Sequence, residues 1–532
     1  MPSPSRLVRC ALALLTVAVL PLGCGRDDSP GATLPPDPSV VKTDSGMVRG
    51  VATLDKRHFA GIPYAAPPVG PLRWQPPQPV TPWQGVRDAT KVGPRCLQDD
   101  GSDLELGKGT SEDCLTLNVW TPAPSNELRP VMVWIHGGAF VNGNGGMYDS
   151  RWLVDRGGVV VVTVNYRLGA LGFLADPSLG PVGAVGNYGL QDQQAALRWV
   201  RDNIEAFGGD PNKVTIAGES AGGMSVCDHM VAPESKGLFR AAIIQSAPCQ
   251  AQLALPEAER ISRDYARAAG CVDPASVAAC LRALPADRLR KPVWYARIGE
   301  DTLSGPVYGT AVLPEDPMTA FAEGRASDVP VLIGSNRDEF TLFVALQYLR
   351  VGRQYAPGEY PGLLADTFGP EAAAVGARYP LDRYGGSAAS AYAAAVTDGV
   401  FLCVADRMTE ELAPRNSVYA YEFNDPNPPT PEPMRTLPFP VGASHSLELR
   451  YLFDIGGAPP LNPAQQQLSN QMVDYWTNFV KNEDPATDGQ PEWPEAGDPP
   501  AIKRLSLQPD GSRLSTDFEA AHQCGFWADR KR

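Results

Sequence analysis

The chain has 532 residues, of which 43% are hydrophobic and 20% are charged; this is typical of a globular protein with a large core and excludes a mainly disordered chain. The formal net charge is −14, and the basic residues form no cluster dense enough to follow a phosphate backbone. Nucleic acid is therefore not expected as a partner. Length alone would allow several domains, but the motifs described below indicate one domain over residues 41–532.

The N-terminus has the features of an export signal. Two arginines precede the apolar run 11–22, which is too short to span a bilayer. The run ends in Pro21-Leu-Gly-Cys24, which resembles a bacterial lipoprotein signal, except that leucine is usual where Pro21 stands. The resemblance implies that residues 1–23 are a signal peptide and that Cys24 is lipidated. The alternative is a plain secretory signal with a chance cysteine.

The next segment, 24–40, is rich in Pro, Gly and Asp, and we expect it to be a flexible linker. The N-terminal features together predict an exported protein, periplasmic or at the cell surface. Lipid on Cys24 would tether it to the membrane, and without that lipid it would be secreted.

Eight cysteines follow the linker, and an even number in an exported chain favours disulfides. They are Cys96, Cys114, Cys227, Cys249, Cys271, Cys280, Cys403 and Cys524. No CxxC pattern occurs and the chain has only five histidines, so we expect neither a metal site nor a cofactor.

Short apolar runs rich in Val and Ile recur along the chain, as in strands that are buried on both faces. They cover 131–135, 159–164, 214–217, 241–245, 329–333 and 418–423. Between two of them, one apolar stripe of an amphipathic helix comprises Leu190, Leu197, Val200, Ile204 and Phe207. This alternation predicts a mostly parallel sheet with helices on both faces. The stretches 251–328 and 341–415 are helical, loop-rich insertions, expected to form walls over an active site.

A glycine-rich loop follows the run 131–135, in the sequence His136-Gly-Gly138-Ala139. Small residues let the backbone approach a substrate closely. A hole for a developing oxyanion needs backbone N–H groups at such a place. We therefore interpret this loop as one half of an oxyanion hole.

The run 214–217 leads directly into Gly218-Glu-Ser220-Ala-Gly222. In a chain with 52 glycines a bare GxSxG is a weak signal, and an ordinary serine in a turn is the alternative. Here a strand precedes the motif and a helix-compatible segment follows it, as the strand-to-helix turn of an α/β-hydrolase nucleophile requires. The context predicts Ser220 as the nucleophile.

A serine hydroxyl needs a base, and in α/β-hydrolases the chain order is serine, acid, histidine. Three histidines follow Ser220. His229 lies only nine residues further along, too near to fold back, and His522 lies in the tail beside Cys524. His445 stands in a glycine-led loop that opens an apolar segment, so we predict it as the base.

The acid is expected on a loop after a strand, between the serine and the histidine. Asp338 and Glu339 both qualify, because they follow the run 329–333 and a short turn. The residue pattern does not separate these two adjacent carboxylates. Asp398 is a third candidate, better explained as a structural hydrogen-bonding residue near the start of a helix.

Four segments resemble signatures of the type-B carboxylesterase and cholinesterase family, and the likeness covers nearly the whole mature chain. They are 59–74 (FAGIPYAAPPVGPLRW), 112–122 (EDCLTLNVWTP), 207–223 (FGGDPNKVTIAGESAGG) and 476–479 (WTNF). The resemblance implies an α/β-hydrolase fold whose helical insertions form an active-site gorge. It further implies hydrolysis of a small-molecule ester through an acyl-enzyme, with a lipase or a catalytically silent adhesion protein on the same fold as alternatives.

The resemblance assigns roles residue by residue. It makes Glu339, rather than Asp338, the acid of the triad. It makes Gly138, Ala139 and Ala221 the oxyanion-hole donors, with Ala139 standing where many members have a third glycine. The alanine is expected to be tolerated, because its N–H group does the work.

The family also implies disulfides Cys96–Cys114 and Cys271–Cys280, and its animal cholinesterases imply Cys403–Cys524. Cys227 and Cys249 then remain as a pair. In one departure, Tyr308 replaces an aspartate that is usual in the family.

The loop between Cys96 and Cys114 contains no aromatic residue, whereas cholinesterases have a tryptophan there that binds the quaternary ammonium. We therefore expect no selective choline site. Four acidic residues of this loop are expected to be solvated and screened; they are Asp99, Asp100, Asp103 and Glu105.

Overall fold

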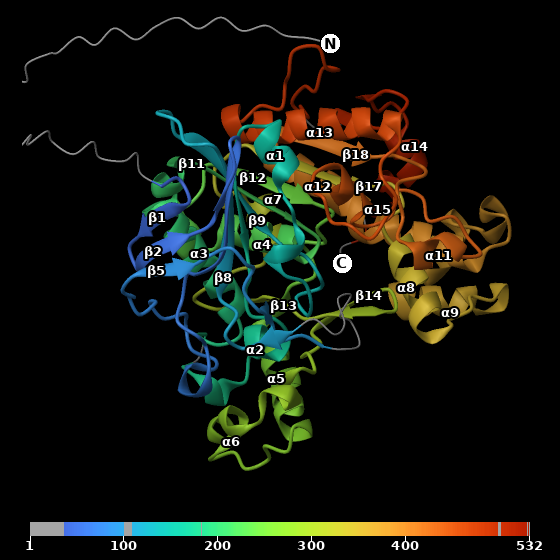
Figure 1. Ribbon diagram of the computed structural model, residues 1–532. Coiled ribbons are helices and arrows are strands. Elements are labelled where there is room, and N and C mark those ends of the chain that lie inside the picture. Colours follow the sequence, from blue (N-terminus) through green and yellow to red (C-terminus); the bar gives the residue numbers. More distant parts are fainter. Residues whose placement is uncertain (1–36, 100–108, 182, 498–501, 529, 531–532) are drawn as a thin grey trace, which may run out of the picture. The chain divides into compact units, whose positions relative to one another are not determined.

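An eleven-stranded mixed sheet runs through the part of the chain that the computed structural model describes, residues 37–99, 109–181, 183–497, 502–528 and 530 (Figure 1). Its strand order is β20-β19-β18-β17-β12-β11-β9-β10-β8-β4-β3. The strands are β3 (Val51–Ala52), β4 (Lys56–Pro63), β8 (Thr116–Pro122), β9 (Arg129–Ile135), β10 (Val160–Val164), β11 (Gly209–Glu219), β12 (Ala241–Gln245), β17 (Val331–Asn336), β18 (Val418–Phe423), β19 (Arg504–Leu507) and β20 (Arg513–Leu514). The predicted signal peptide and Cys24 lie outside the described residues.

The seven strands from β10 to β19 are parallel to one another, and antiparallel strands flank them on both sides. All six predicted strands are present in this parallel part. Several strand ends differ from the predicted runs; β17, for example, begins at Val331 and not at Val329. Pro330 has no N–H group to donate to a neighbouring strand, so regular pairing starts after it.

Alternate residues of each central strand face opposite sides of the sheet. On β9, Val131 and Val133 belong to one hydrophobic core, and Met132 and Trp134 belong to another. Helices α3 (Tyr188–Asn203), α4 (Ala221–Val231) and α12 (Cys403–Leu412) cover the first face, and α1 (Arg151–Asp155) and α13 (Pro463–Asn482) cover the second. The sheet is thus buried on both sides, as the continuous apolar runs predict.

The predicted amphipathic helix is α3, and all five residues of its apolar stripe are buried. The α-helix ends earlier than the stripe, at Asn203, and Ile204–Phe207 form a tighter 3-10 turn. Gly208 follows with a φ of 89°, a left-handed conformation that ends the helix at little cost for glycine.

Both predicted insertions contain helices. The first comprises α5 (Leu255–Ala268), α6 (Val277–Ala283), α7 (Pro317–Ala322) and the short strands β13 (Leu253–Ala254), β14 (Ala296–Ile298), β15 (Asp301–Leu303) and β16 (Val307–Tyr308). Tyr308, which departs from the family pattern, lies half-buried in the pair β13–β16. The second comprises α8 (Thr341–Val351), α9 (Tyr360–Phe368), α10 (Ala372–Arg378) and α11 (Ala388–Val396), and it has a hydrophobic core of its own.

Helix α11 continues through a π-helical turn, Thr397–Leu402, into α12. Within the described residues, this combined helix, Ala388–Leu412, is the one that is long and apolar enough to cross a membrane. However, 83% of its most apolar stretch of 18 residues is buried inside the protein, as expected for a core helix.

The remaining elements are short. They are β1 (Val40–Thr43), β2 (Gly46–Arg49) and β5 (Val86–Asp88), which form a small sheet, β6 (Arg95–Cys96), β7 (Thr110–Ser111), α2 (Gly169–Phe173), α14 (Phe518–His522) and α15 (Cys524–Ala528). Strand β1 begins at Val40, one residue before the expected domain boundary at residue 41.

The described chain contains four disulfides: Cys96–Cys114, Cys227–Cys249, Cys271–Cys280 and Cys403–Cys524. The last one joins residues 121 positions apart in the sequence and holds the C-terminal helix α15 against α12. Four disulfides are compatible with an exported protein.

Candidate active site

Ser220 lies in the sharp turn between β11 and α4, with a φ of 58° and a ψ of −125°. This strained conformation is uncommon for a residue that has a side chain. The turn is possible because its neighbours are glycines. A Cβ atom on Gly218 would lie 2.4 Å from the backbone of Gly222, and one on Gly222 would lie 2.0 Å from the carbonyl oxygen of Ile135.

The glycine-rich loop after β9 lies directly against Ser220. A Cβ atom on Gly137 would lie 3.0 Å from the Cβ of Ser220. Gly138 has a φ of 108° and Ala139 a φ of 54°, so the loop turns sharply beside the serine. Gly138 and Ala139 thus directly follow the residue that lies against Ser220, and Ala221 begins α4.

His445 is buried and pairs with Glu339: its Nδ1 lies 2.5 Å from Oε2 of the carboxylate. The second oxygen of Glu339 accepts a hydrogen bond of 2.7 Å from the backbone N–H of Asn336. The adjacent Asp338 instead accepts a hydrogen bond of 2.9 Å from the N–H of Ala443. Of the two carboxylates that the residue pattern did not separate, Glu339 is the one in contact with the imidazole.

The other nitrogen of His445 faces a carboxylate that the motif analysis did not consider as a site residue. Nε2 lies 3.1 Å from Oε1 of Glu219, and this oxygen also accepts a hydrogen bond of 2.6 Å from the hydroxyl of Ser446. Glu219 could have been noticed in the sequence, because it is the residue x of Gly218-x-Ser220, directly before the predicted nucleophile.

A third carboxylate, Glu448, completes a buried acidic cluster around the imidazole. It accepts hydrogen bonds of 2.6 Å from the Asn336 amide and 3.1 Å from the Gln245 amide. No sequence pattern singled out Glu448, since Gln245 and Asn336 end two different strands. Burial, together with the charges of Glu219 and Glu339, raises the pKa of Glu448 to about 8.

These charges set the protonation of the site. Burial acts to lower the pKa of His445, but the carboxylates of Glu219 and Glu339 outweigh it and raise that pKa to about 9. Burial also raises the pKa of Glu219, against the opposing effect of His445. The cluster therefore holds its protons tightly, and the imidazole is more basic than an isolated histidine.

Both insertions contact the site. In the second insertion, the rings of Phe343 and Phe401 lie 5.1 and 5.4 Å from the His445 ring. In the first, the N–H of Ser304 donates a hydrogen bond of 3.2 Å to the carbonyl of Ala139. They supply walls beside the histidine and the glycine-rich loop, as the sequence predicts.

The other candidates lie elsewhere. His229 is buried within α4 and bonds to Ser235 and Gln193. His522 pairs with Asp398, with 2.6 Å between Nδ1 and Oδ1. Asp398 is indeed a structural hydrogen-bonding residue, but it lies inside the continuous helix 388–412 and not near a helix start.

The described residues contain no group of three or more His, Cys, Asp or Glu side chains that could hold a metal ion. Of the four loop acids named above, Asp100, Asp103 and Glu105 lie outside the described residues. Residues 100–108, a large part of the loop between Cys96 and Cys114, lie outside them too.

Comparison with known proteins now adds to the geometry. Residues 37–527 match the model of the carboxylesterase family. The chain belongs to this family. The carboxylesterase is 35% identical to cocaine esterase of Homo sapiens, covering 98% of this chain and 94% of that protein. It is 35% identical to acylcarnitine hydrolase of Mus musculus (85% and 83%) and 32% identical to cholinesterase of Mus musculus (92% and 86%).

The expectations about fold class and reaction class are thereby confirmed. The carboxylesterase has the α/β-hydrolase fold, with a large, mostly parallel sheet covered by helices on both faces. It is a carboxylic ester hydrolase. The nucleophile turn at the carboxyl end of β11 is where this fold carries its reactive serine.

Proposed function

We propose that this carboxylesterase hydrolyses esters through a triad of Ser220, His445 and Glu339, with an acyl-enzyme intermediate. The observation that supports this most strongly is the contact of 2.5 Å between Glu339 and Nδ1 of His445, beside the strained turn of Ser220. A carboxylate on Nδ1 holds the proton of the neutral imidazole on that nitrogen and orients Nε2 as the base.

In the proposed reaction, the hydroxyl oxygen of Ser220 attacks the ester carbonyl while Nε2 of His445 takes its proton. The N–H groups of Gly138, Ala139 and Ala221 donate hydrogen bonds to the oxyanion that forms. The tetrahedral intermediate collapses, and His445 returns the proton to the departing alcohol. Water, deprotonated by His445, then hydrolyses the acyl-serine and releases the acid.

Nε2 faces Glu219 at 3.1 Å in this structure, so the first proton transfer requires that Nε2 exchange this carboxylate for the hydroxyl of Ser220. Apo active sites often have catalytic hydrogen bonds that tighten only when substrate is bound. We assign to Glu219 the stabilisation of the imidazolium that forms when His445 takes the proton. Of the two carboxylates that contact the imidazole, Glu219 and Glu339, it is the one nearer to Nε2.

The test is Ser220→Ala. This variant should hydrolyse p-nitrophenyl acetate roughly a thousandfold or more slowly than the wild type, because acylation needs the serine oxygen. An organophosphate should inactivate the wild type and label Ser220. Retained hydrolysis by the alanine variant would assign the nucleophile to another residue.

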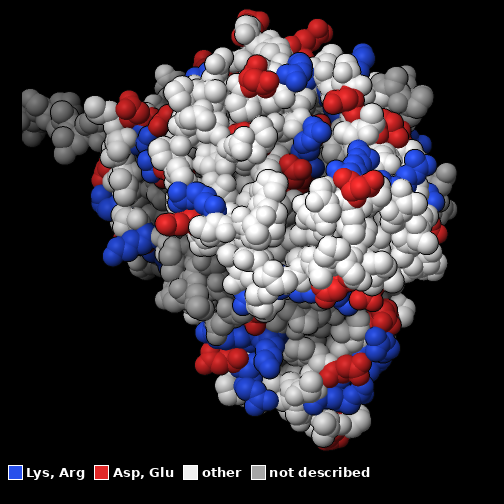
Figure 2. All heavy atoms as spheres, turned by 90° about the vertical axis from the view of Figure 1, so that its right-hand side faces the viewer, with Lys and Arg blue, Asp and Glu red and all other residues white. Residues whose placement is uncertain are grey.

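We propose small-molecule esters as the substrates. Relatives are named for substrates as different as cocaine, acylcarnitines and pyrethroids, which favours a broad ester pocket. On the face of the molecule shown in Figure 2, basic and acidic side chains are interspersed, and a broad area carries neither. A series of p-nitrophenyl esters of increasing acyl length would measure the size of the pocket.

We further propose that the protein is exported and held at a membrane by lipid on Cys24. The four disulfides and the N-terminal sequence support export. A mature N-terminal peptide that begins at Cys24 and carries the mass of a diacylglycerol would support the tether, and cleavage at another position would exclude it.

A further inference from the structure

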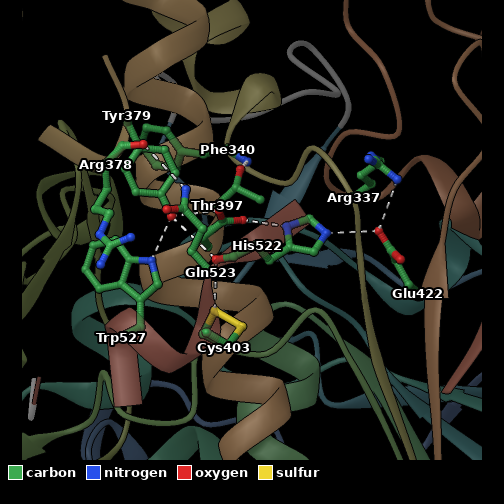
Figure 3. A network of polar contacts seen from close by, with 12 residues as sticks. Arg337, Phe340, Arg378, Tyr379, Thr397, Cys403, Glu422, His522, Gln523 and Trp527 are labelled. Carbon is green, nitrogen blue, oxygen red and sulfur yellow. Dashed lines mark hydrogen bonds and ion pairs between the residues drawn. A yellow bond between two sulfur atoms is a disulfide. The ribbon is translucent and has the colours of Figure 1, made fainter. Parts of the chain in front are cut away.

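A second buried histidine, His522, forms an ion cluster that the proposed mechanism does not use. It ends helix α14 in the C-terminal tail, and both of its ring nitrogens contact carboxylates (Figure 3). Nδ1 lies 2.6 Å from Asp398, and Nε2 lies 3.1 Å from Glu422. All three side chains are buried, with at most 4% of each residue exposed.

The two carboxylates belong to different elements. Asp398 lies in the π-helical turn between α11 and α12, and Glu422 lies on β18. Asp398 also accepts a hydrogen bond of 2.8 Å from the hydroxyl of Tyr379, which in turn accepts one from the Trp527 indole. His522 therefore links the C-terminal tail to the second insertion and to the central sheet.

The cluster and its neighbour Thr397 contact the short segment that carries Glu339, before and after Glu339 itself. Before Glu339, the guanidinium of Arg337 lies 3.8 Å from Glu422. After it, the backbone N–H of Phe340 donates a hydrogen bond of 2.9 Å to the hydroxyl of Thr397, the neighbour of Asp398. Figure 3 shows Arg337 and Phe340 on either side of the histidine.

A cavity of 1120 Å³ borders both this segment and the His522 cluster, at the carboxyl ends of β17, β18 and β19. Its lining includes Arg337, Asp338, Asp398 and His522. Residues that flank Glu339 therefore border open space. Polar contacts of Arg337 to Glu422 and of Phe340 to Thr397 are among those that hold them.

We propose that His522 is a positioning residue that holds Glu339 in register with His445, because it joins Glu422, which contacts Arg337, to Asp398, whose neighbour Thr397 contacts Phe340. The inference rests on the proposed role of Glu339. Without the histidine, two buried carboxylates lose the group that both of them contact, and such charges move apart, take up water or bind protons. Each of these three responses shifts Arg337 or Thr397, and with them the 2.5 Å contact on which the base depends.

The test is His522→Gln, which keeps a polar side chain but no positive charge. The turnover number kcat should fall tenfold or more while KM stays within about twofold, because no substrate contact is lost. The matched control is His58→Gln on β4, where the histidine stacks on Trp120. The control should retain wild-type kcat and KM.

A second variant separates positioning from simple loss of structure. In the double variant His522→Gln, Asp398→Asn, the uncompensated charge is removed and Glu422 keeps Arg337 as its partner. It should recover kcat to within about threefold of the wild type. A double variant that is no better than the single one would overturn the proposal.

A third variant serves if His522→Gln does not fold. Thr397→Val has nearly the same shape but removes the acceptor for the N–H of Phe340. It should lower kcat several-fold at unchanged KM, and unchanged kcat would contradict the proposed link. The triad is tested separately: if Glu339→Gln is inactive while the His522 and Thr397 variants are fully active, the triad stands and the positioning role fails.

Discussion

At the scale of single residues, the chemistry of the site depends on how three carboxylates surround one imidazole. Glu339 and Glu219 contact opposite nitrogens of His445, and Glu448 lies behind them on two amide donors. An imidazole with two carboxylate neighbours is a strong base but keeps its proton to high pH. The pH dependence of the activity should therefore depend on the charges of the carboxylates as well as on the protonation of the histidine.

Glu219→Gln should move the activity profile to lower pH. The carboxylate raises the pKa of His445, so its replacement by a neutral amide lowers that pKa. Because His445 accepts the proton only when neutral, kcat/KM increases with pH through its pKa, and this rise should shift down by about one pH unit. Profiles of kcat/KM for p-nitrophenyl acetate measure the shift. Glu127→Gln, an exposed position, is the control, and equal profiles for both variants would contradict the expectation.

Glu339→Gln and Asp338→Asn form a matched pair of adjacent substitutions. The first removes the carboxylate on Nδ1 of His445 and should lower kcat by roughly a thousandfold or more. The second leaves an amide oxygen that still accepts the N–H of Ala443, so kcat should stay within about threefold of the wild type. Similar small losses in both variants would show that neither is the acid.

At the scale of elements, the site is assembled from the carboxyl ends of parallel strands. The glycine-rich loop follows β9, Ser220 follows β11 and Glu339 follows β17. Parallel neighbours end at the same edge of a sheet, which brings residues that are far apart in sequence into contact. The insertions then supply Phe343 and Phe401 beside His445.

These walls do not include an aromatic side chain from the segment between Cys96 and Cys114, since its sequence has none. Acetylthiocholine and its neutral tert-butyl isostere should therefore differ in kcat/KM by less than tenfold, about 1.4 kcal/mol. A cation over an aromatic ring contributes roughly 0.5 to 2 kcal/mol, so a choline site at the upper end of this range would exceed the limit. A large preference for the cation at physiological salt would show that Phe343, Phe401 or another aromatic residue forms such a site.

At the scale of the whole molecule, the disulfides differ in how much of the chain they constrain. Cys403–Cys524 spans 121 residues and Cys271–Cys280 spans 9. Loop-closure entropy assigns about 5 kcal/mol to the first and about 2.6 kcal/mol to the second. Thermal unfolding of the two paired serine variants should show the larger decrease in Tm for Cys403→Ser, Cys524→Ser. Equal decreases would mean that the tail is held by its packing alone.

The sequence by itself determined those parts of the protein that local patterns encode. Buried strands need continuous apolar runs, and the turn at Ser220 needs glycines at 218 and 222, so both can be recognised from neighbouring residues. The family motifs added the pairing of cysteines and the choice of Glu339, which the residue pattern had left open between adjacent carboxylates.

Only the tertiary structure decided which distant groups meet. Glu219 and Glu448 surround His445, and His522 joins Asp398 to Glu422, because the sheet and the tail bring together segments that are up to 227 residues apart. Each of these residues is an ordinary polar residue within its own segment. Burial and proximity alter the basicity of their side chains, and both properties arise only when the chain has packed.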